Sequence, residues 1–530
     1  MTRSLLGFLA SSLLVTGAPA QTTEDDKLTA QDAASGDLLG FSVAIGGTTG
    51  VAGAPLSTPN GSNSGSVYLF DLTNGQQIQK LIPSDGDVGD RFGWSVAASS
   101  KLVIIGAYGD DDNGTDSGSA YCFDKKAGVE LFKFLPSDGA SGDRFGASMA
   151  IFFELAIVGA PRDDDNGSDS GSVYVFDITS GLELGKLTAS DGAAFDLFGE
   201  AVAISGNYAL IGAPEDNDNG ASSGSVYVFD LTTYQQVHKL TASDGAEGDR
   251  FGCAVALDGT MALVGSSSDD DGGTNSGSAY VFDITTGQEL EKLTASDGAA
   301  GDFFGVAVAL EDGVALIGAH FDDDAGADSG SAYTFDVATG LQTAKLQGSD
   351  VGPGDFYGYS VALAEATPLV GAHYHDAAAS DTGAAYLYGV TADSIIRYCE
   401  ATQNPNNAAV IDIDTTDSSS ASILVNLASA PANQFVYLLV GNGNATVSQP
   451  PGAKGDLCVV GGSCLGRYDK DVGQITSVGT FTTDIQNALS NPCAGAVTIT
   501  LGATWNFQYW HRQPMGQPAT FSDAISVTFD

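Results

Sequence analysis

Basic residues are scarce in this chain. Its 530 residues include 20 lysines and arginines against 66 aspartates and glutamates, which gives a formal net charge of −46 at pH 7. A charge of that sign and size repels phosphate-rich partners, so nucleic acid and anionic lipid are excluded as ligands. Divalent cations would neutralise, and a high salt concentration would screen, the charge of so many carboxylates.

Long hydrophobic runs are missing from almost the whole chain. Beyond the first segment the longest candidate is Phe435 to Val440, far below the roughly 18 residues that cross a bilayer, so no membrane insertion is expected. The exception is the start, where Arg3 precedes an apolar run from Leu5 to Val15 and Ala18-Pro19-Ala20 follows. This pattern predicts a signal peptide over residues 1–20 and a secreted, extracellular or cell-surface protein.

Recognisable catalytic motifs are few. Neither a His-Glu-x-x-His zinc motif nor a phosphate-binding Gly-Lys-Thr is present, and the only metal-like histidine grouping is His373-Tyr374-His375. Two histidines do not make a zinc site, which usually needs three or four protein ligands. We therefore expect no enzyme activity.

Cysteines are few and unevenly placed. Cys122 and Cys253 stand alone, and the residue context of Cys122 predicts a buried free thiol. The other four lie in the last part of an exported chain, where two disulfides are expected, and their three possible pairings stay open. These four are Cys399, Cys458, Cys464 and Cys493.

A unit of 53 residues repeats seven times. Each unit has Phe-Gly or a close variant, an apolar run ending in Gly-Ala or Gly-Ser, then Gly-Ser-Val-Tyr-Val-Phe-Asp or a variant, then Lys-Leu or Lys-Phe. The spacing is strict. The first element stands at Leu39-Gly40, Phe92-Gly93, Phe145-Gly146, Phe198-Gly199, Phe251-Gly252, Phe304-Gly305 and Tyr357-Gly358.

Each unit contains four short runs with strand character, exemplified by Glu200 to Ile204, Tyr208 to Ala213, Ser225 to Asp230 and Gln236 to Thr241. Four strands repeated seven times predict an all-β fold, a seven-bladed β-propeller over residues 21–390. No Lys-Leu follows the seventh unit, whereas an extra copy at Lys27 precedes the first. We therefore expect an N-terminal strand to close the ring as the outer strand of the last blade.

Strand alternation sorts the loops into two faces, and the long acidic connections share one of them. Acidic clusters follow the second strand in blades two to six, and calcium, which takes six to eight oxygen ligands, would suit them. Solvated acidic turns, rich in Asp, Asn and Gly for backbone reasons, are the alternative. The candidate metal ligands are Asp110, Asp112, Asp116, Asp163, Asp165, Asp169, Glu215, Asp216, Asp218, Asp269, Asp271, Asp322, Asp324 and Asp328.

The repeated Phe-Gly, Gly-Ala-Pro and Gly-Ser-Val-Tyr-Val-Phe elements closely resemble the FG-GAP repeats of integrin α-subunit propellers and of secreted bacterial proteins. The resemblance implies an extracellular propeller for adhesion or ligand binding, often with calcium. One departure matters. The family's calcium loop lies between the Phe-Gly and Gly-Ala-Pro strands, and in the fourth unit that interval, Glu200 to Ile211, contains no Asp. The family's calcium ligands therefore do not carry over to this chain.

Residues 391–530 predict a second, small β-sandwich-like domain. Their Tyr398-Cys399, Leu457-Cys458 and Trp505 to Trp510 elements resemble a terminal module of secreted bacterial proteins. For the whole chain we predict a secreted or cell-surface adhesion protein whose acidic face binds an extracellular protein or glycan. A propeller-based hydrolase or lyase and a passive structural surface component remain alternatives, and the oligomeric state stays open.

Overall fold

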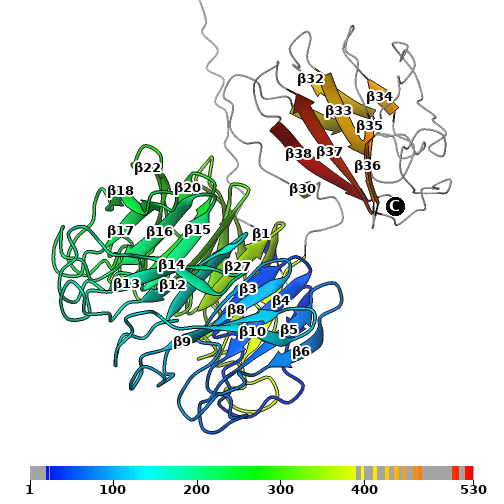
Figure 1. The fold of residues 1–530 in the computed structure, drawn as a ribbon. Coiled ribbons are helices and arrows are strands. Elements are labelled where there is room, and N and C mark those ends of the chain that lie inside the picture. Colours follow the sequence, from blue (N-terminus) through cyan, green and yellow to red (C-terminus); the bar gives the residue numbers. More distant parts are fainter. Residues whose placement is uncertain are drawn as a thin grey trace, which may run out of the picture. The chain divides into compact units, whose positions relative to one another are not determined.

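The computed structural model describes residues 20–22 and 24–389, together with the strands between Ile396 and Thr528, and shows two units, Met1–Val390 and Thr391–Asp530 (Figure 1). The described residues are all-β, and none of them forms a helix able to cross a bilayer. The segment assigned to the signal peptide lies outside the described residues, apart from Ala20.

The first unit is a seven-bladed β-propeller, as predicted. Each blade is an antiparallel four-stranded sheet, the inner strands of neighbouring blades contact one another, and β27 contacts β3 to complete the ring. Blade one consists of β3 (Ser42–Gly46), β4 (Thr49–Ala54), β5 (Ser66–Asp71) and β6 (Gln76–Leu81), and blade two of β7 (Ser95–Ala98), β8 (Leu102–Ala107), β9 (Ser119–Asp124) and β10 (Val129–Phe134). Blade three consists of β11 (Ser148–Phe152), β12 (Leu155–Ala160), β13 (Ser172–Asp177) and β14 (Leu182–Leu187), and blade four of β15 (Ala201–Ser205), β16 (Tyr208–Ala213), β17 (Ser225–Asp230) and β18 (Gln235–Leu240). Blade five consists of β19 (Ala254–Asp258), β20 (Met261–Ser266), β21 (Ser278–Asp283) and β22 (Gln288–Leu293), and blade six of β23 (Ala307–Glu311), β24 (Val314–Ala319), β25 (Ser331–Asp336) and β26 (Leu341–Leu346). Blade seven consists of β27 (Ser360–Ala364), β28 (Thr367–Ala372) and β29 (Ala384–Leu387), together with β2 (Asp26–Leu28).

The ring closes through the N-terminal strand, which confirms the prediction made from the Lys-Leu count. β2 pairs antiparallel with β29, with Lys27 opposite Tyr386, and so supplies the fourth strand of blade seven. Leu28 is fully buried in the core shared by blades seven and one. A further strand, β1 (Ala20–Thr22), pairs in parallel with β26 at the outer edge of blade six.

The repeated aromatic residues build the layers between blades. In blade four the ring of Phe198 lies edge-on to Tyr227 and Phe229, with centroid distances of 5.4 and 5.9 Å. All three are buried, and each burial contributes about 1.5–3 kcal/mol. A Cβ on Gly212 would overlap the carbonyl oxygen of Gly252 in the next copy, so close blade packing explains the Gly of Gly-Ala.

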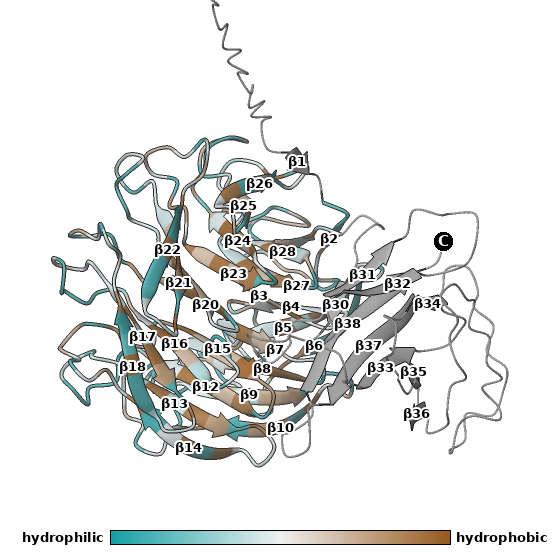
Figure 2. Cartoon of the chain, turned by 90° about the horizontal axis from the view of Figure 1, so that it is seen from above, coloured by the Kyte–Doolittle hydropathy of each residue, from teal (hydrophilic) through white to brown (hydrophobic). Residues whose placement is uncertain are grey.

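Hydrophobicity falls from the middle strands of a blade to its outer strand, as Figure 2 shows for β18 and β22. In β16 all residues after Tyr208 are buried, whereas β18, of sequence Gln-Gln-Val-His-Lys-Leu, alternates exposed and partly buried side chains over its first four residues. An outer strand with one polar face needs this alternation. The Lys-Leu pair at the end of the strand departs from this pattern, with Leu240 buried and Lys239 partly buried, and this lysine belongs to the site described below.

The second unit contains two sheets. One has six strands in the order β30-β38-β37-β33-β35-β36, and the other three in the order β31-β32-β34. The all-β prediction holds for the described strands, while the side chains behind the disulfide prediction lie outside the described residues. The strands are β30 (Ile396–Tyr398), β31 (Val410–Asp414), β32 (Leu424–Ala428), β33 (Phe435–Val440), β34 (Thr446–Ser448), β35 (Leu457–Gly461), β36 (Cys464–Arg467), β37 (Thr504–Arg512) and β38 (Thr520–Thr528).

Candidate binding face of the propeller

The long connections emerge together at one end of the blades, because antiparallel strands bring the second-to-third loop and the blade-to-blade loop to the same side. In blade two Lys133 contacts both Asp85, in the connection from blade one, and Asp110, in its own second-to-third loop. We call this side the loop face. It comprises residues 29–41, 55–65, 82–94, 108–118, 135–147, 161–171, 188–200, 214–224, 241–253, 267–277, 294–306, 320–330, 347–359 and 373–383.

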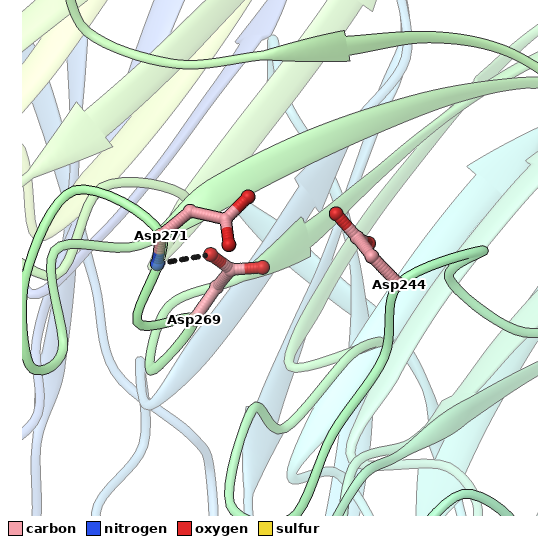
Figure 3. Close-up of side chains that lie close together, drawn as sticks. All are labelled: Asp244, Asp269 and Asp271. Carbon is pink, nitrogen blue, oxygen red and sulfur yellow. Dashed lines mark hydrogen bonds between the residues drawn. The ribbon is translucent and has the colours of Figure 1, made fainter.

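A lysine lies among the carboxylates of blade five, where Figure 3 shows Asp244, Asp269 and Asp271 converging. The Nζ atom of Lys292 is 2.7, 3.1 and 2.5 Å from the Oδ2 atoms of Asp244, Asp269 and Asp271. The hydroxyl of Tyr280 lies within hydrogen-bond distance of Asp244 and Asp269, at 2.8 and 2.7 Å. Four polar groups thus meet around one ammonium ion.

The same cluster recurs in five blades, from two to six. The inner aspartate of each is about 5% exposed, whereas the other two are about half exposed. We call these five groups the lysine clusters. They are Lys133 with Asp85, Asp110 and Asp112; Lys186 with Asp138, Asp163 and Asp165; Lys239 with Asp191, Asp216 and Asp218; Lys292 with Asp244, Asp269 and Asp271; and Lys345 with Asp297, Asp322 and Asp324.

Electrostatics hold each lysine charged. Burial alone would lower the pKa of Lys292, but the hydrogen bonds that it donates to the three carboxylates raise it above its usual value. Burial alone would raise the pKa of Asp244, but Lys292 and Tyr280 hold it below its usual value. Removing one partner from such a buried group usually costs about 3–5 kcal/mol, because the remaining charges lose their compensation.

The donor set does not fit a calcium ion while the lysine is present. The oxygens of Asp244, Asp269 and Asp271 lie within 4.8 Å of one another, a spacing compatible with a shared ion. However, Lys292 already bonds to all three, and a divalent cation beside an ammonium would face strong repulsion. The lysine ammonium supplies the positive charge that the sequence argument assigned to calcium. Calcium binding itself stays a prediction.

Four of the candidate ligands are not part of the lysine clusters. Asp116, Asp169 and Asp328 sit at the end of the second-to-third loop with positive φ, and their backbone N–H groups donate to an aspartate five residues earlier. Glu215 pairs instead with Arg250, whose Nη2 atom is 2.9 Å away. The three aspartates therefore fix their own loops, and Glu215 links its loop to the connection that leads to blade five.

Blades one and seven have another residue in place of the inner aspartate of the lysine clusters. Blade one has Ser57 at the position of the inner aspartate, and among the described carboxylates Lys80 forms an ion pair with Asp32 alone, at 2.7 Å. Blade seven has His375 there, with Nε2 2.6 Å from Lys27 and Nδ1 2.7 Å from Asp355. Because lysine can only donate, the histidine accepts at Nε2 and donates from Nδ1 to Asp355.

The lysines and the carboxylates that come from the preceding blade were missed by the sequence argument. Each belongs to a visible motif, Lys-Leu or Lys-Phe for the cation and Ser-Asp-Gly for the carboxylate, as in Ser84-Asp85-Gly86. The lysine and that aspartate are 48 positions apart in every cluster. Repeat-wide comparison of charges at fixed separations would have found the pair.

A second buried aspartate in each of several connections has an altered pKa. Asp143 is 5% exposed, and its Oδ2 atom accepts a hydrogen bond from the Ala140 N–H at 2.6 Å. Burial, assisted by the charges of Asp163 and Asp164, raises its pKa from 3.8 to about 6. Asp90 and Asp302 show the same rise to about 6.

Asp143→Asn should stabilise the propeller at pH 7.5. The pKa of Asp143 is higher in the folded state than in the unfolded chain, so its favourable contribution is full below about pH 4 and is lost as the pH rises through about 6. We expect a gain of about 1–2 kcal/mol at pH 7.5 that vanishes near pH 4. Chemical unfolding across this range, with Glu154→Gln on the opposite face as control, measures it; an equal gain at both pH values would contradict the assignment.

The geometry defines a rigid propeller with a charged loop face. Models of the FG-GAP repeat match seven segments, residues 22–70, 76–123, 129–176, 182–229, 234–282, 288–335 and 341–388, which together cover well over half of the chain. The chain therefore belongs to the FG-GAP repeat family. Each match begins in or near the outer strand of one blade and ends in the third strand of the next, as the closure requires. No curated protein matches the sequence.

Membership of the family carries a general meaning. FG-GAP repeats are typical of extracellular or surface proteins, and their propellers are in general non-catalytic folds that bind protein ligands. A loop face on a rigid scaffold is where such binding residues concentrate. The loop face is accordingly the candidate binding surface of this chain.

Proposed function

We propose that this chain is exported and acts as an adhesion protein, binding another extracellular protein through the loop face of its propeller. The observation that carries the proposal is the set of lysine clusters. They satisfy the inner carboxylates and fix the loops, while the outer acids stay available to a partner. A pre-organised surface loses little conformational entropy when it binds, which favours affinity.

The outer acids define the chemistry of the partner. Asp111, Asp164 and Asp323 are exposed, and each uses one oxygen to accept a backbone N–H within its own loop. With a net charge of −46 behind them, they favour a partner whose contact surface is rich in lysine and arginine. Charge complementarity of this kind accelerates association and weakens with salt.

An array of purified extracellular proteins and glycans, probed with the full chain, tests the proposal. The test variant is Asp111→Asn/Asp164→Asn/Asp323→Asn, which removes three charges from the loop face while the amide oxygens keep the backbone hydrogen bonds. The control, Glu154→Gln/Asp312→Asn/Glu365→Gln, removes three charges from the turns on the opposite face.

We expect a protein ligand whose affinity falls about tenfold or more for the loop-face variant and less than twofold for the control, because charges outside the contact act only weakly. The loss should shrink as salt is raised. Equal losses for the two variants, or a ligand that both bind as tightly as the parent, would refute binding through the loop face.

A further inference from the structure

The arginines of the propeller gather at one place. Between residues 24 and 389 the chain has four, and all lie on the loop face. Arg91, Arg144 and Arg250 occupy the same repeat position, directly before the Phe of Phe-Gly, and Arg162 directly follows Pro161. Arg91, Arg144 and Arg250 each stand four residues before an inner strand (β7, β11 and β19), whereas Arg162 follows β12, the second strand of blade three. The loop face therefore carries all four arginines as well as the acidic clusters.

Two of these arginines stack on the same aromatic ring. The guanidinium carbons of Arg91 and Arg144 lie 5.1 and 5.2 Å from the centroid of Tyr108, and Arg91 also lies 5.9 Å from Trp94. Stacking fixes the planar guanidinium group and leaves its edge, with its N–H donors, free. The arrangement thus fixes two guanidinium groups and leaves their N–H donors available for hydrogen bonds.

The arginine donors are largely unused. Arg250 pairs with Glu215, but no described carboxylate lies within 4.0 Å of Arg91, Arg144 or Arg162. The charge of Glu200 interacts with those of Arg250, Arg144 and Arg162, yet Glu200 forms no ion pair within that distance. The chain has 66 acidic residues, yet these guanidinium groups form no ion pair with a described carboxylate. Their donors are therefore available to an acceptor from another molecule.

An aromatic wall continues from the arginines around the axis. Phe41 lies 4.4 Å from Trp94 and 5.1 Å from Tyr359, and Tyr359 lies 4.3 Å from His373. The wall extends through His320 to the neighbouring blade. Trp94 contacts both Phe41 of this wall and Arg91, so the aromatic side chains and the arginines adjoin one another.

Two polar atoms in this wall lack a partner. His320 and His373 are 7% and 3% exposed, and the Nδ1 atom of each is buried without a hydrogen bond from the described residues. Burial lowers the pKa of both side chains, to about 4 and about 3, so both are neutral. A buried polar group without a partner destabilises the fold, and a bound group that donates a hydrogen bond to it would remove that cost.

We propose that this axial cluster, comprising Arg91, Arg144, Arg162 and the wall of Trp94, Tyr359 and His373, receives a carboxylate side chain with an adjacent aromatic side chain from the protein partner. The guanidinium edges match a carboxylate in bidentate geometry, and the wall matches a ring. A single carboxylate suits the site better than a multiply charged anion, which the surrounding acidic loops would repel. The inference rests on the proposed function and adds the partner's central contact.

Short peptides test the axial cluster without the partner. We would titrate the full chain with acetyl-Asp-Phe-amide, acetyl-Asn-Phe-amide and acetyl-Lys-Phe-amide, following saturation transfer to the phenyl protons. The Asp peptide should bind at least tenfold more tightly than the other two. Arg144→Gln and Arg162→Gln should each weaken the Asp peptide severalfold and leave the Asn peptide unchanged.

Lys101→Gln removes the same charge from a turn on the opposite face and should change nothing, and melting temperatures verify that each variant is folded. Equal binding of the Asp and Asn peptides, tighter binding of the Lys peptide, or an Arg144→Gln variant with full affinity would overturn the inference. The two proposals fail separately, because a partner can depend on the outer acids while the Asp peptide shows no preference, and the reverse.

Discussion

Replacing Lys186 by methionine lowers the free energy of unfolding by about 3–5 kcal/mol, the usual cost of breaking a buried ion pair from one side. Lys186 lies 2.9, 3.0 and 2.6 Å from the carboxylates of Asp138, Asp163 and Asp165, and its side chain is 17% exposed. Methionine preserves the length of the stem and removes the charge, so the three carboxylates then repel one another. Thermal and chemical unfolding measure the loss.

Calcium gives this variant a second readout. Without the lysine, three converging carboxylates offer the oxygen ligands that calcium prefers. We therefore expect millimolar calcium to raise the melting temperature of Lys186→Met and to leave that of the parent chain unchanged. Lys101→Met, on an exposed turn, is the control and should melt like the parent. A parent chain that calcium stabilises as strongly as the variant would show that metal, rather than lysine, neutralises the face.

Removal of the N-terminal strand should have the second large effect. A chain that begins at residue 30 lacks β2, and with it the buried Leu28, the pairing of Lys27 with Asp350 and the hydrogen-bond partner of β29. An open ring loses the interface that closes it and exposes the edge of β29, which promotes association through strand pairing. We expect a melting temperature lower by at least about 10 °C and oligomers in size-exclusion chromatography.

The matched control begins at residue 24, so it also lacks β1 but keeps β2 whole. It should remain as monodisperse as the parent chain and melt close to it. A chain starting at residue 30 that keeps the parent's melting temperature would mean that blade seven is stable with three strands, and that the ring does not depend on the N-terminal strand.

The repeat made the fold predictable. A strict spacing of 53 positions fixed the number of blades, and the extra Lys-Leu at Lys27 identified the closing strand, because a ring must join its ends. The connection at Gly206-Asn207 is too short for a parallel crossover, and the structure accordingly pairs Ser205 with Tyr208 in antiparallel strands. Local turn chemistry and copy number, both visible in the sequence, suffice for a propeller.

The site was less predictable, for two physical reasons. The cation in each lysine cluster comes from the outer strand and one carboxylate from the previous blade, as with Lys133 and Asp85, so neither is a sequence neighbour of the acidic loop. The axial cluster is hidden for the opposite reason. Arg144 has no counterpart in blade six, where Phe303 stands at the same position, and a comparison that seeks shared residues passes over those that differ.

Amide hydrogen exchange of the full chain, free and bound to a protein ligand found on the array, tests binding through the loop face most directly. The account predicts slower exchange in the connections of the loop face, such as residues 82–94 and 135–147, and no change in the short turns on the opposite face. Protection confined to those turns or to Thr391–Asp530 would contradict it.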